Sequence, residues 1–268
     1  MRVIGHIAVN VFRESVRDKV LYNLVIFAVL LIAVSLLLGQ LTAGQDIKII
    51  KDLGLAAISL FGLFIAVFIG IGLVSKEVER RSIYSLLSKP IRRQEFIAGK
   101  YLGLVLTLLV NVTVMTAAYY AVLGSMAWVA GGWFLPAWEA PAMDPALLKA
   151  IAMIFLQLMM VTALALLCST FTSPILATAL TFGLYIVGQF NADLRHFETI
   201  VASRPVALLA RVLYYVLPNL SRLDVKTQVV HALPVPAGYM LWSAAYALAY
   251  VAALLALATA IFMRRDFK

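Results

Sequence analysis

The sequence has few charged residues and a single cysteine. Only 13% of its 268 residues are Asp, Glu, Lys or Arg, and 63% are hydrophobic. Soluble domains are roughly a quarter charged and half apolar. Cys168 has no second cysteine with which to form an intramolecular disulfide. The shortage of charge excludes an ordinary soluble domain and predicts an all-α protein with several membrane-spanning helices.

Motifs that are typical of enzymes are also missing. There is no paired-histidine helix motif, and His6, His196 and His231 are far apart in the sequence. Gly99-Lys100 resembles the end of a phosphate-binding loop, but Gln94 stands where that motif requires an earlier glycine. We therefore expect no catalytic residue, metal or cofactor in this chain, so any energy source must belong to a partner.

The net charge of +9 suggests two kinds of partner, nucleic acid or membrane lipid. The basic residues gather at the ends of the long apolar segments instead of forming one continuous face. This placement favours contact with anionic lipid. We expect membrane lipid as a partner and no nucleic acid.

Six apolar segments approach the length of about 20 helical residues that a bilayer requires. They cover residues 21–38, 53–74, 101–123, 147–167, 175–190 and 239–262. None of these segments carries an Asp, Glu, Lys, Arg or His side chain at mid-depth, which disfavours an ion-coupled carrier or a proton relay. The sequence therefore predicts a single domain, residues 1–268, with six transmembrane helices.

Residues 1–20 form an amphipathic segment before the first span. Ile4, Ile7 and Val11 lie near one face, and Arg2, Arg13, Arg17 and Lys19 fill the other. This pattern favours a helix that lies in the membrane interface. The alternative is that the segment extends the first span into the cytosol.

The distribution of basic residues predicts the orientation of the spans. Of the 22 Lys and Arg residues, 14 lie before the first span, in the loop 75–100 or after the last span. Cytoplasmic segments carry such an excess. Residues 124–145 contain three tryptophans and no basic residue, as is typical of the opposite side. Both termini are thus predicted to be cytoplasmic, and residues 191–236 to form an extracytoplasmic segment with interfacial or re-entrant helices.

Two groups of residues within the spans predict helix packing. Gly62, Ala66 and Gly70 are four residues apart, a spacing that lets two helix backbones approach closely. The other reading is ordinary tolerance of glycine in membrane helices. A polar group in the third span favours hydrogen bonds between helices over a substrate path; its members are Thr107, Asn111, Thr113 and Thr116.

The loop 75–100 between the second and third spans is the most strongly charged part of the chain. Ile83, Leu86 and Leu87 form a short apolar stripe at helical spacing, and Pro90 ends that helix. The loop therefore predicts a short cytoplasmic helix with an apolar stripe and a basic rim, which suits contact with a partner.

The same loop closely resembles that of the type-2 ABC-transporter permease family. The matching features are the acidic and basic cluster from Glu77 to Arg81, the pair Leu86-Leu87, Ser88, Pro90, Arg92-Arg93 and Gly99-Lys100. Ser82 stands where the family commonly has glycine. Residues 217–224 further resemble the subgroup linked to copper-enzyme maturation.

The resemblance implies that the loop is a coupling helix that docks on a separate ATP-binding subunit, which holds the ATP and Mg. The residues expected to contact this subunit are Glu77, Glu79, Arg80, Arg81, Ile83, Leu86, Leu87, Pro90, Arg92 and Arg93. The alternative is that the arginines only hold the loop at anionic headgroups. The family further implies a homodimer in a prokaryotic inner membrane.

Two functions therefore follow from the sequence. The first is a permease subunit that couples ATP hydrolysis to export of a substrate or to transmission of a conformational change across the membrane. The second is a non-transporting scaffold whose segment 191–236 holds an extracytoplasmic protein. Only the first requires the ATPase subunit.

Overall fold

The computed structural model describes residues 2–40, 46–79, 93–129, 143–191, 214 and 217–264. All regular secondary structure in these ranges is helical, which confirms the all-α prediction. The elements are α1 (Arg2–Val16), α2 (Lys19–Gln40), α3 (Asp46–Glu79), α5 (Arg93–Val129), α6 (Ala146–Phe171), α7 (Pro174–Gln189), η1 (Ser221–Leu223), α11 (Lys226–Val230) and α12 (Ala237–Arg264).

Five helices in the described part are long and apolar enough to cross a membrane. They cover Lys19–Gly39, Ile47–Gly72, Gln94–Trp128, Ala146–Phe171 and Ala237–Met263. Each contains most or all of a predicted span, so the integral membrane character of the chain is confirmed. The fifth predicted span, residues 175–190, corresponds to the shorter helix α7, and a sixth crossing stays a prediction.

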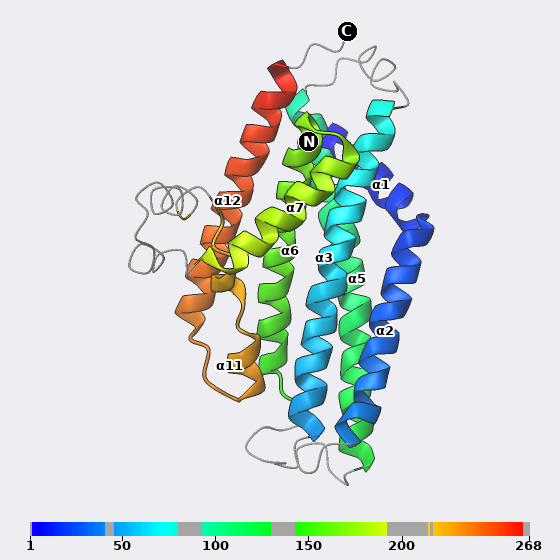
Figure 1. Ribbon diagram of the computed structural model, residues 1–268, viewed down its shortest axis with the longest axis vertical. Helices are drawn as coiled ribbons and strands as arrows, with labels where there is room; N and C mark the ends of the chain where they lie inside the picture. Colours follow the sequence, from blue (N-terminus) through cyan, green and yellow to red (C-terminus); the bar gives the residue numbers. More distant parts are fainter. Residues whose placement is uncertain are drawn as a thin grey trace, which may run out of the picture.

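The long helices run roughly parallel, and the two ends of the bundle differ in which helices begin and end there (Figure 1). α2 and α5 end at one end, where α3 and α6 begin. α3 and α12 end at the opposite end, where α5 begins. The end of α3 and the start of α5 thus lie at the opposite end of the bundle from the end of α5 and the start of α6.

α6 is the central helix of the bundle. It is apolar on all sides, and the residues from Met160 to Thr170 are buried without interruption. A helix that is hydrophobic all round must be covered on every face. α3, α5, α7 and α12 all pack against α6. α2 and α12 form the periphery, since only 22% of the spanning residues of each are buried.

α7 is too short to cross a bilayer along the normal. Its 16 residues extend about 24 Å at 1.5 Å per residue, against a hydrocarbon thickness of about 30 Å. It also crosses the bundle obliquely (Figure 1). The segment from residue 217 onward packs below its end, where the Leu220 backbone N–H donates to the Gly188 carbonyl at 3.0 Å.

Residues 217–236, which belong to the predicted extracytoplasmic segment, pack against the helix bundle. Their apolar side chains are buried against α3 and α6; they are Leu220, Leu223, Val225, Val229 and Val230. The backbone N–H of Asn219 donates to the Tyr246 hydroxyl of α12 at 2.9 Å. The predicted amphipathic stretch before residue 217 lies outside the described residues, except for residue 214.

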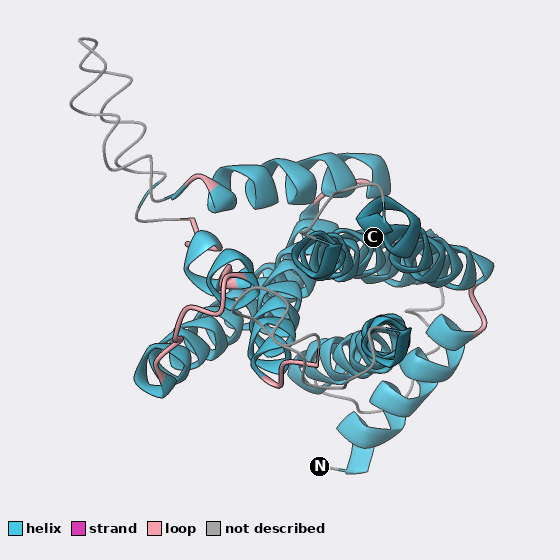
Figure 2. Ribbon diagram, turned by 90° about the horizontal axis from the view of Figure 1, so that it is seen from below, coloured by secondary structure: helices cyan, strands magenta, loops and turns pink. Residues whose placement is uncertain are grey.

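α1 is a separate helix and does not continue into α2. α1 ends at Val16, and α2 begins at Lys19 after a break in which Asp18 Oδ1 accepts the Val20 N–H at 3.0 Å. Figure 2 shows α1 lying across the bundle axis, whereas the long helices are seen nearly end-on. The alternative, in which residues 1–20 extend the first span, is therefore wrong. Its position in the membrane interface stays a prediction.

Candidate coupling site and helix contacts

The structure describes the two ends of the predicted coupling loop. Glu77 and Glu79 lie in the last turn of α3, and Arg93 is the first residue of α5. α3 and α5 pack against each other, so they hold the two ends of the loop at the same end of the bundle (Figure 1). The other predicted contact residues lie outside the described residues; they are Arg80, Arg81, Ile83, Leu86, Leu87, Pro90 and Arg92.

α1 packs closely on the first turns of α5, directly after the loop. A Cβ atom on Gly99 would lie 2.8 Å from the Ile7 Cβ atom. A Cβ atom on Gly103 would lie 2.6 Å from the Ala8 carbonyl oxygen and 2.7 Å from the Val11 Cβ atom. Only glycine permits this approach. We call Gly99 and Gly103 the glycine notch.

The glycine notch was not predicted as a packing site. Gly99 was noted only as part of the Gly99-Lys100 pair at the start of the third span. The spacing of four residues between Gly99 and Gly103 is the signal that would have found it, because small residues at this spacing mark close helix contacts in membranes.

Two further contacts tie the start of α5 to the bundle. The Lys100 Nζ atom lies 4.7 Å from the centroid of the Phe96 ring, and this ring stacks on Phe262 of α12 at 6.0 Å. The Tyr101 hydroxyl donates to the Met159 carbonyl of α6 at 3.3 Å. A displacement of the start of α5 at Arg93 would therefore change its contacts with α1, α6 and α12 at the same time.

The predicted small-residue stripe of α3 faces α6 of the same chain. A Cβ atom on Gly62 would lie 2.5 Å from Leu158 Cδ1, and one on Gly70 would lie 3.2 Å from the Ala165 Cβ atom. Ala66 lies between them and is 2% exposed. The sequence left open whether this stripe packs within one subunit or between two, and the structure places it within one.

Filling the stripe is expected to separate α3 from α6. The double variant Gly62→Leu plus Gly70→Leu should lose about 1–3 kcal/mol per site, the usual cost of overpacking. Gly72→Leu is the matched control on the same helix, because no atom lies within 4 Å of a Cβ built there. Apparent Tm and monodispersity in detergent measure the effect, and equal values for the two variants would contradict a packing role.

The polar side chains of the third span bond within their own helix, and the prediction of bonds between helices is wrong for them. Each donates to the carbonyl four residues earlier. The pairs are Thr107 with Gly103, Asn111 with Thr107, Thr113 with Leu109, and Thr116 with Val112. In hydrocarbon such local bonding satisfies a hydroxyl or amide donor without a second helix.

A polar cluster at the opposite end of the bundle was missed. Lys51 lies in α3 and is fully buried. Asp144, just before α6, is the main opposite charge that acts on it. The Tyr119 hydroxyl donates to the Lys51 carbonyl at 3.2 Å, and the Tyr120 hydroxyl donates to the Asp144 carbonyl at 3.2 Å. This cluster joins α3, α5 and the start of α6.

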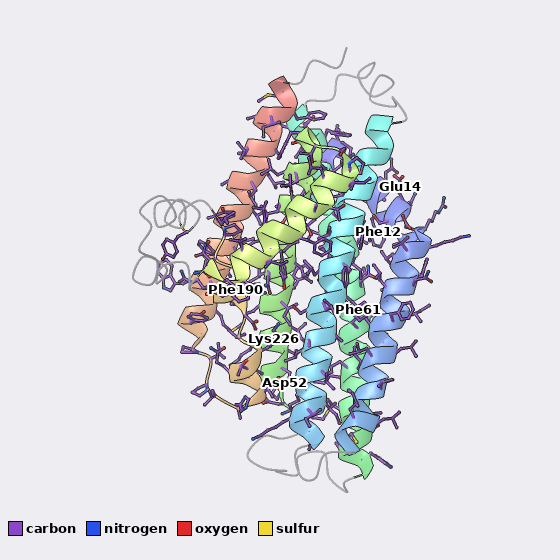
Figure 3. All side chains as sticks on the ribbon, viewed as in Figure 1. Phe12, Glu14, Asp52, Phe61, Phe190 and Lys226 are labelled. Carbon is purple, nitrogen blue, oxygen red and sulfur yellow. The ribbon has the colours of Figure 1, made fainter. Side chains whose placement is uncertain are left out.

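Asp52, the next residue of α3, extends this cluster to residues 217–236. Asp52 is exposed and interacts electrostatically with His231 and Lys226, at the two ends of α11. Figure 3 shows Asp52 and Lys226 near the same end of the bundle. Lys226 also forms an ion pair with Asp224, with Nζ and Oδ2 3.3 Å apart. α11 packs beside the start of α3, and opposite charges lie on the two helices.

Comparison with known proteins assigns the family. The sequence matches the family described as "ABC-2 family transporter protein" over residues 6–267. No curated protein matches the sequence. The link of residues 217–224 to the copper-enzyme maturation subgroup stays a prediction. Because the match covers nearly the whole chain, the protein belongs to the ABC-2 transporter family as a type-2 ABC permease.

Proposed function

We propose that this chain is the transmembrane subunit of an ATP-driven transporter and couples ATP hydrolysis in a separate subunit to movement of its own helices. The family match over residues 6–267 is the observation that carries the proposal. ATP and Mg are bound by the partner subunit, and the product of the coupling is substrate export or a conformational change passed across the membrane.

The loop 75–100 is the proposed docking element. Ile83, Leu86 and Leu87 enter an apolar groove of the ATPase subunit, and Arg80, Arg81, Arg92 and Arg93 pair with acidic residues at the rim of that groove. The contacts of α5 support this role. Its first turns touch α1 at the glycine notch, α12 through Phe96 and α6 through Tyr101.

We further propose a homodimer with both termini in the cytoplasm of a prokaryotic cell. α2 supports this arrangement because it presents an exposed apolar face to the membrane or to a second copy. That face includes Ile26, Phe27, Leu30 and Leu37, each more than half exposed. A permease built from two copies would place its substrate path between them.

A membrane scaffold that anchors an extracytoplasmic protein is the second candidate. The segment from residue 217 to residue 236 favours it, because this segment is fixed on α3, α6 and α12 and gives a rigid surface. Arg222 is held there by the Tyr246 ring, 5.6 Å away, and by the Tyr239 hydroxyl, which donates to its carbonyl at 2.7 Å. The scaffold requires no ATPase subunit, so a binding experiment separates the two functions.

The double variant Leu86→Asp plus Leu87→Asp is expected to lose the ATPase subunit. Two carboxylates in an apolar groove must give up their hydration without a partner charge, which costs several kcal/mol. Co-purification of the tagged chain with the cognate ATPase subunit from membranes should fall at least tenfold relative to wild type.

The matched control places the same two charges in the segment predicted to be extracytoplasmic. Phe134→Asp plus Leu135→Asp should retain the ATPase subunit at the wild-type level. Undiminished binding by the Leu86→Asp plus Leu87→Asp variant, with normal insertion and monodispersity, would show that the loop is not the docking element and would favour the scaffold.

A further inference from the structure

Two buried polar groups lack the hydrogen bond that a membrane interior demands. Gln157 lies near the middle of α6 and is 1% exposed, and Ser243 lies in the first third of α12 and is 0% exposed. Neither the Gln157 Nε2 atom nor the Ser243 Oγ atom has a hydrogen-bond partner in the part of the chain that the structure describes. A buried donor without a partner destabilises the arrangement that buries it.

Other buried hydroxyls of the bundle are bonded within their own helices. Thr162 of α6 is 1% exposed and donates to the Leu158 carbonyl at 2.8 Å. Ser35 of α2 is 0% exposed and donates to the Ile32 carbonyl at 2.6 Å. Such local bonds are the usual way in which a polar side chain is accommodated in a membrane helix. The two unpartnered groups on α6 and α12 are therefore not a general property of this bundle.

The positions of the two groups single out the packing of α12 on α6. Ser243 lies on the one buried face of α12, and this face packs mainly against α6; its other members are Ala247, Val251, Leu254 and Ala258. Gln157 directly precedes Leu158, which meets Gly62 of α3. Because one residue turns about 100° around a helix, Gln157 faces away from the α3 contact. Of the other helices that cover α6, α12 makes the most extensive contact.

α12 is held less firmly than the other helices that pack on α6. Only 22% of its spanning residues are buried, against 72% in α3. α3 approaches α6 closely at Gly62 and Gly70, and α5 is bonded to α6 through Tyr101. An open trough of about 300 Å³ separates residues 94–98 of α5 from residues 255–263 of α12. A movement of α12 therefore exposes less apolar surface than a movement of α3 and leaves the contacts among α3, α5 and α6 intact.

We infer that α12 moves away from α6 in a second state of the chain, where the Gln157 amide and the Ser243 hydroxyl gain hydrogen bonds to water that enters between the two helices. The penalty for the unpartnered groups exists only while α12 is packed on α6, so it brings the closed and open states closer in free energy. The inference goes beyond the proposed function and does not rest on it, because the opening is an equilibrium of this chain without nucleotide or the ATPase subunit.

The reactivity of an introduced thiol measures this opening. Ser243→Cys and Ser35→Cys replace fully buried serines on the two peripheral helices, and Cys168→Ala in both chains removes the native thiol. In membranes that contain the full chain, a maleimide is expected to modify the Ser243→Cys chain roughly tenfold faster or more than the Ser35→Cys control. Adding Gln157→Met to the Ser243→Cys chain should slow the reaction by roughly fivefold or more, because an apolar side chain of similar shape stabilises the closed state.

A stability measurement keeps the inference testable if the Ser243→Cys chain fails to fold. Gln157→Met alone should raise the apparent Tm in detergent by about 3–8 °C. The matched control Thr162→Val removes a hydroxyl of α6 that is already bonded and should not raise it. Equal reactivity of the two introduced thiols, a reaction rate that Gln157→Met leaves unchanged, or an apparent Tm of Gln157→Met at or below that of wild type would each overturn the inference.

Discussion

Replacing Asp144 with asparagine is expected to destabilise the protein by about 3 kcal/mol, whereas replacing Lys51 with methionine is expected to change its stability little. Lys51 is fully buried, and Asp144 is the main opposite charge that acts on it. Loss of an opposite charge that acts on a buried charge is costly, and removal of one partner of a buried ion pair costs roughly 3–5 kcal/mol. Asp144 is only partly buried, which places the expected value at the lower end.

The two variants differ because Asp144→Asn leaves the buried charge of Lys51 in place, whereas Lys51→Met removes it. Asparagine keeps an Oδ1 atom in the position that accepts the Ala146 N–H at 2.8 Å, so the turn before α6 is preserved. The buried ammonium of Lys51 then loses the attraction of the Asp144 carboxylate, while the like charge of Lys48 still acts on it. Methionine instead removes the buried charge and fills a similar volume, a change that is often neutral.

Apparent Tm in detergent separates these outcomes. Asp144→Asn should lower it by roughly 6–12 °C, and Lys51→Met by less than about 3 °C. The double variant should resemble Lys51→Met, because the charge that Asp144 compensates is then absent. If both single variants lost the same stability, the attraction between Lys51 and Asp144, and not the charge that remains on Lys51, would have to account for the loss.

The burial of Lys51 shows why hydropathy alone does not predict where a membrane helix begins. The sequence placed the second span at residues 53–74, because hydropathy falls at Lys51 and Asp52. α3 nevertheless begins at Asp46. The additional turns are covered by Tyr119 of α5 and by Asp144, which are remote in the sequence. Tertiary contacts, which no local pattern contains, therefore decide where this helix begins.

The features that were predicted correctly depend on local patterns. The all-helical architecture and five long apolar helices follow from hydropathy and from the spacing of apolar residues. α7 differs, since its length is limited by contacts that span the chain. A Cβ atom on Gly188 would lie 2.9 Å from Leu220 Cδ1 and 3.0 Å from the Pro218 carbonyl oxygen. The segment after residue 217 thus occupies the space below the end of α7.

The candidate coupling site was predictable only through its resemblance to a family. Its charge and apolar stripe are visible in the sequence, but they suit a lipid-facing connector as well as a docking helix. The glycine notch beside it was visible as a spacing, yet the spacing does not say which helix fills it. Only the structure shows that α1, which precedes the first span in the sequence, is the partner of Gly99 and Gly103.

Replacing Gly103 with leucine is expected to detach α1 from α5. The new side chain would meet the Ala8 carbonyl oxygen and the Val11 Cβ atom, both within 2.7 Å of its Cβ position. Backbone and Cβ atoms cannot turn aside as the end of a flexible side chain does, so α1 itself must move. Overpacking of this kind costs about 1–3 kcal/mol, here concentrated on a single helix contact.

Amide hydrogen exchange measures this detachment directly. Residues 2–16 should exchange roughly tenfold faster or more in Gly103→Leu than in wild type, while α6 stays protected. Gly124→Leu is the matched control on α5, because no atom lies within 4 Å of a Cβ built at Gly124. Faster exchange in both variants would mean that leucine disturbs α5 as a whole and that the glycine notch is not the cause.

The same variant shows whether α1 takes part in coupling or only anchors the chain. The loop end at Arg93 is linked to α1 through the glycine notch and to α6 and α12 through Tyr101 and Phe96. If α1 transmits the motion of the loop, Gly103→Leu should bind the ATPase subunit normally but lose stimulation of its ATP hydrolysis. Normal stimulation despite fast exchange in residues 2–16 would assign transmission to the α6 and α12 contacts, and α1 would then be a membrane anchor.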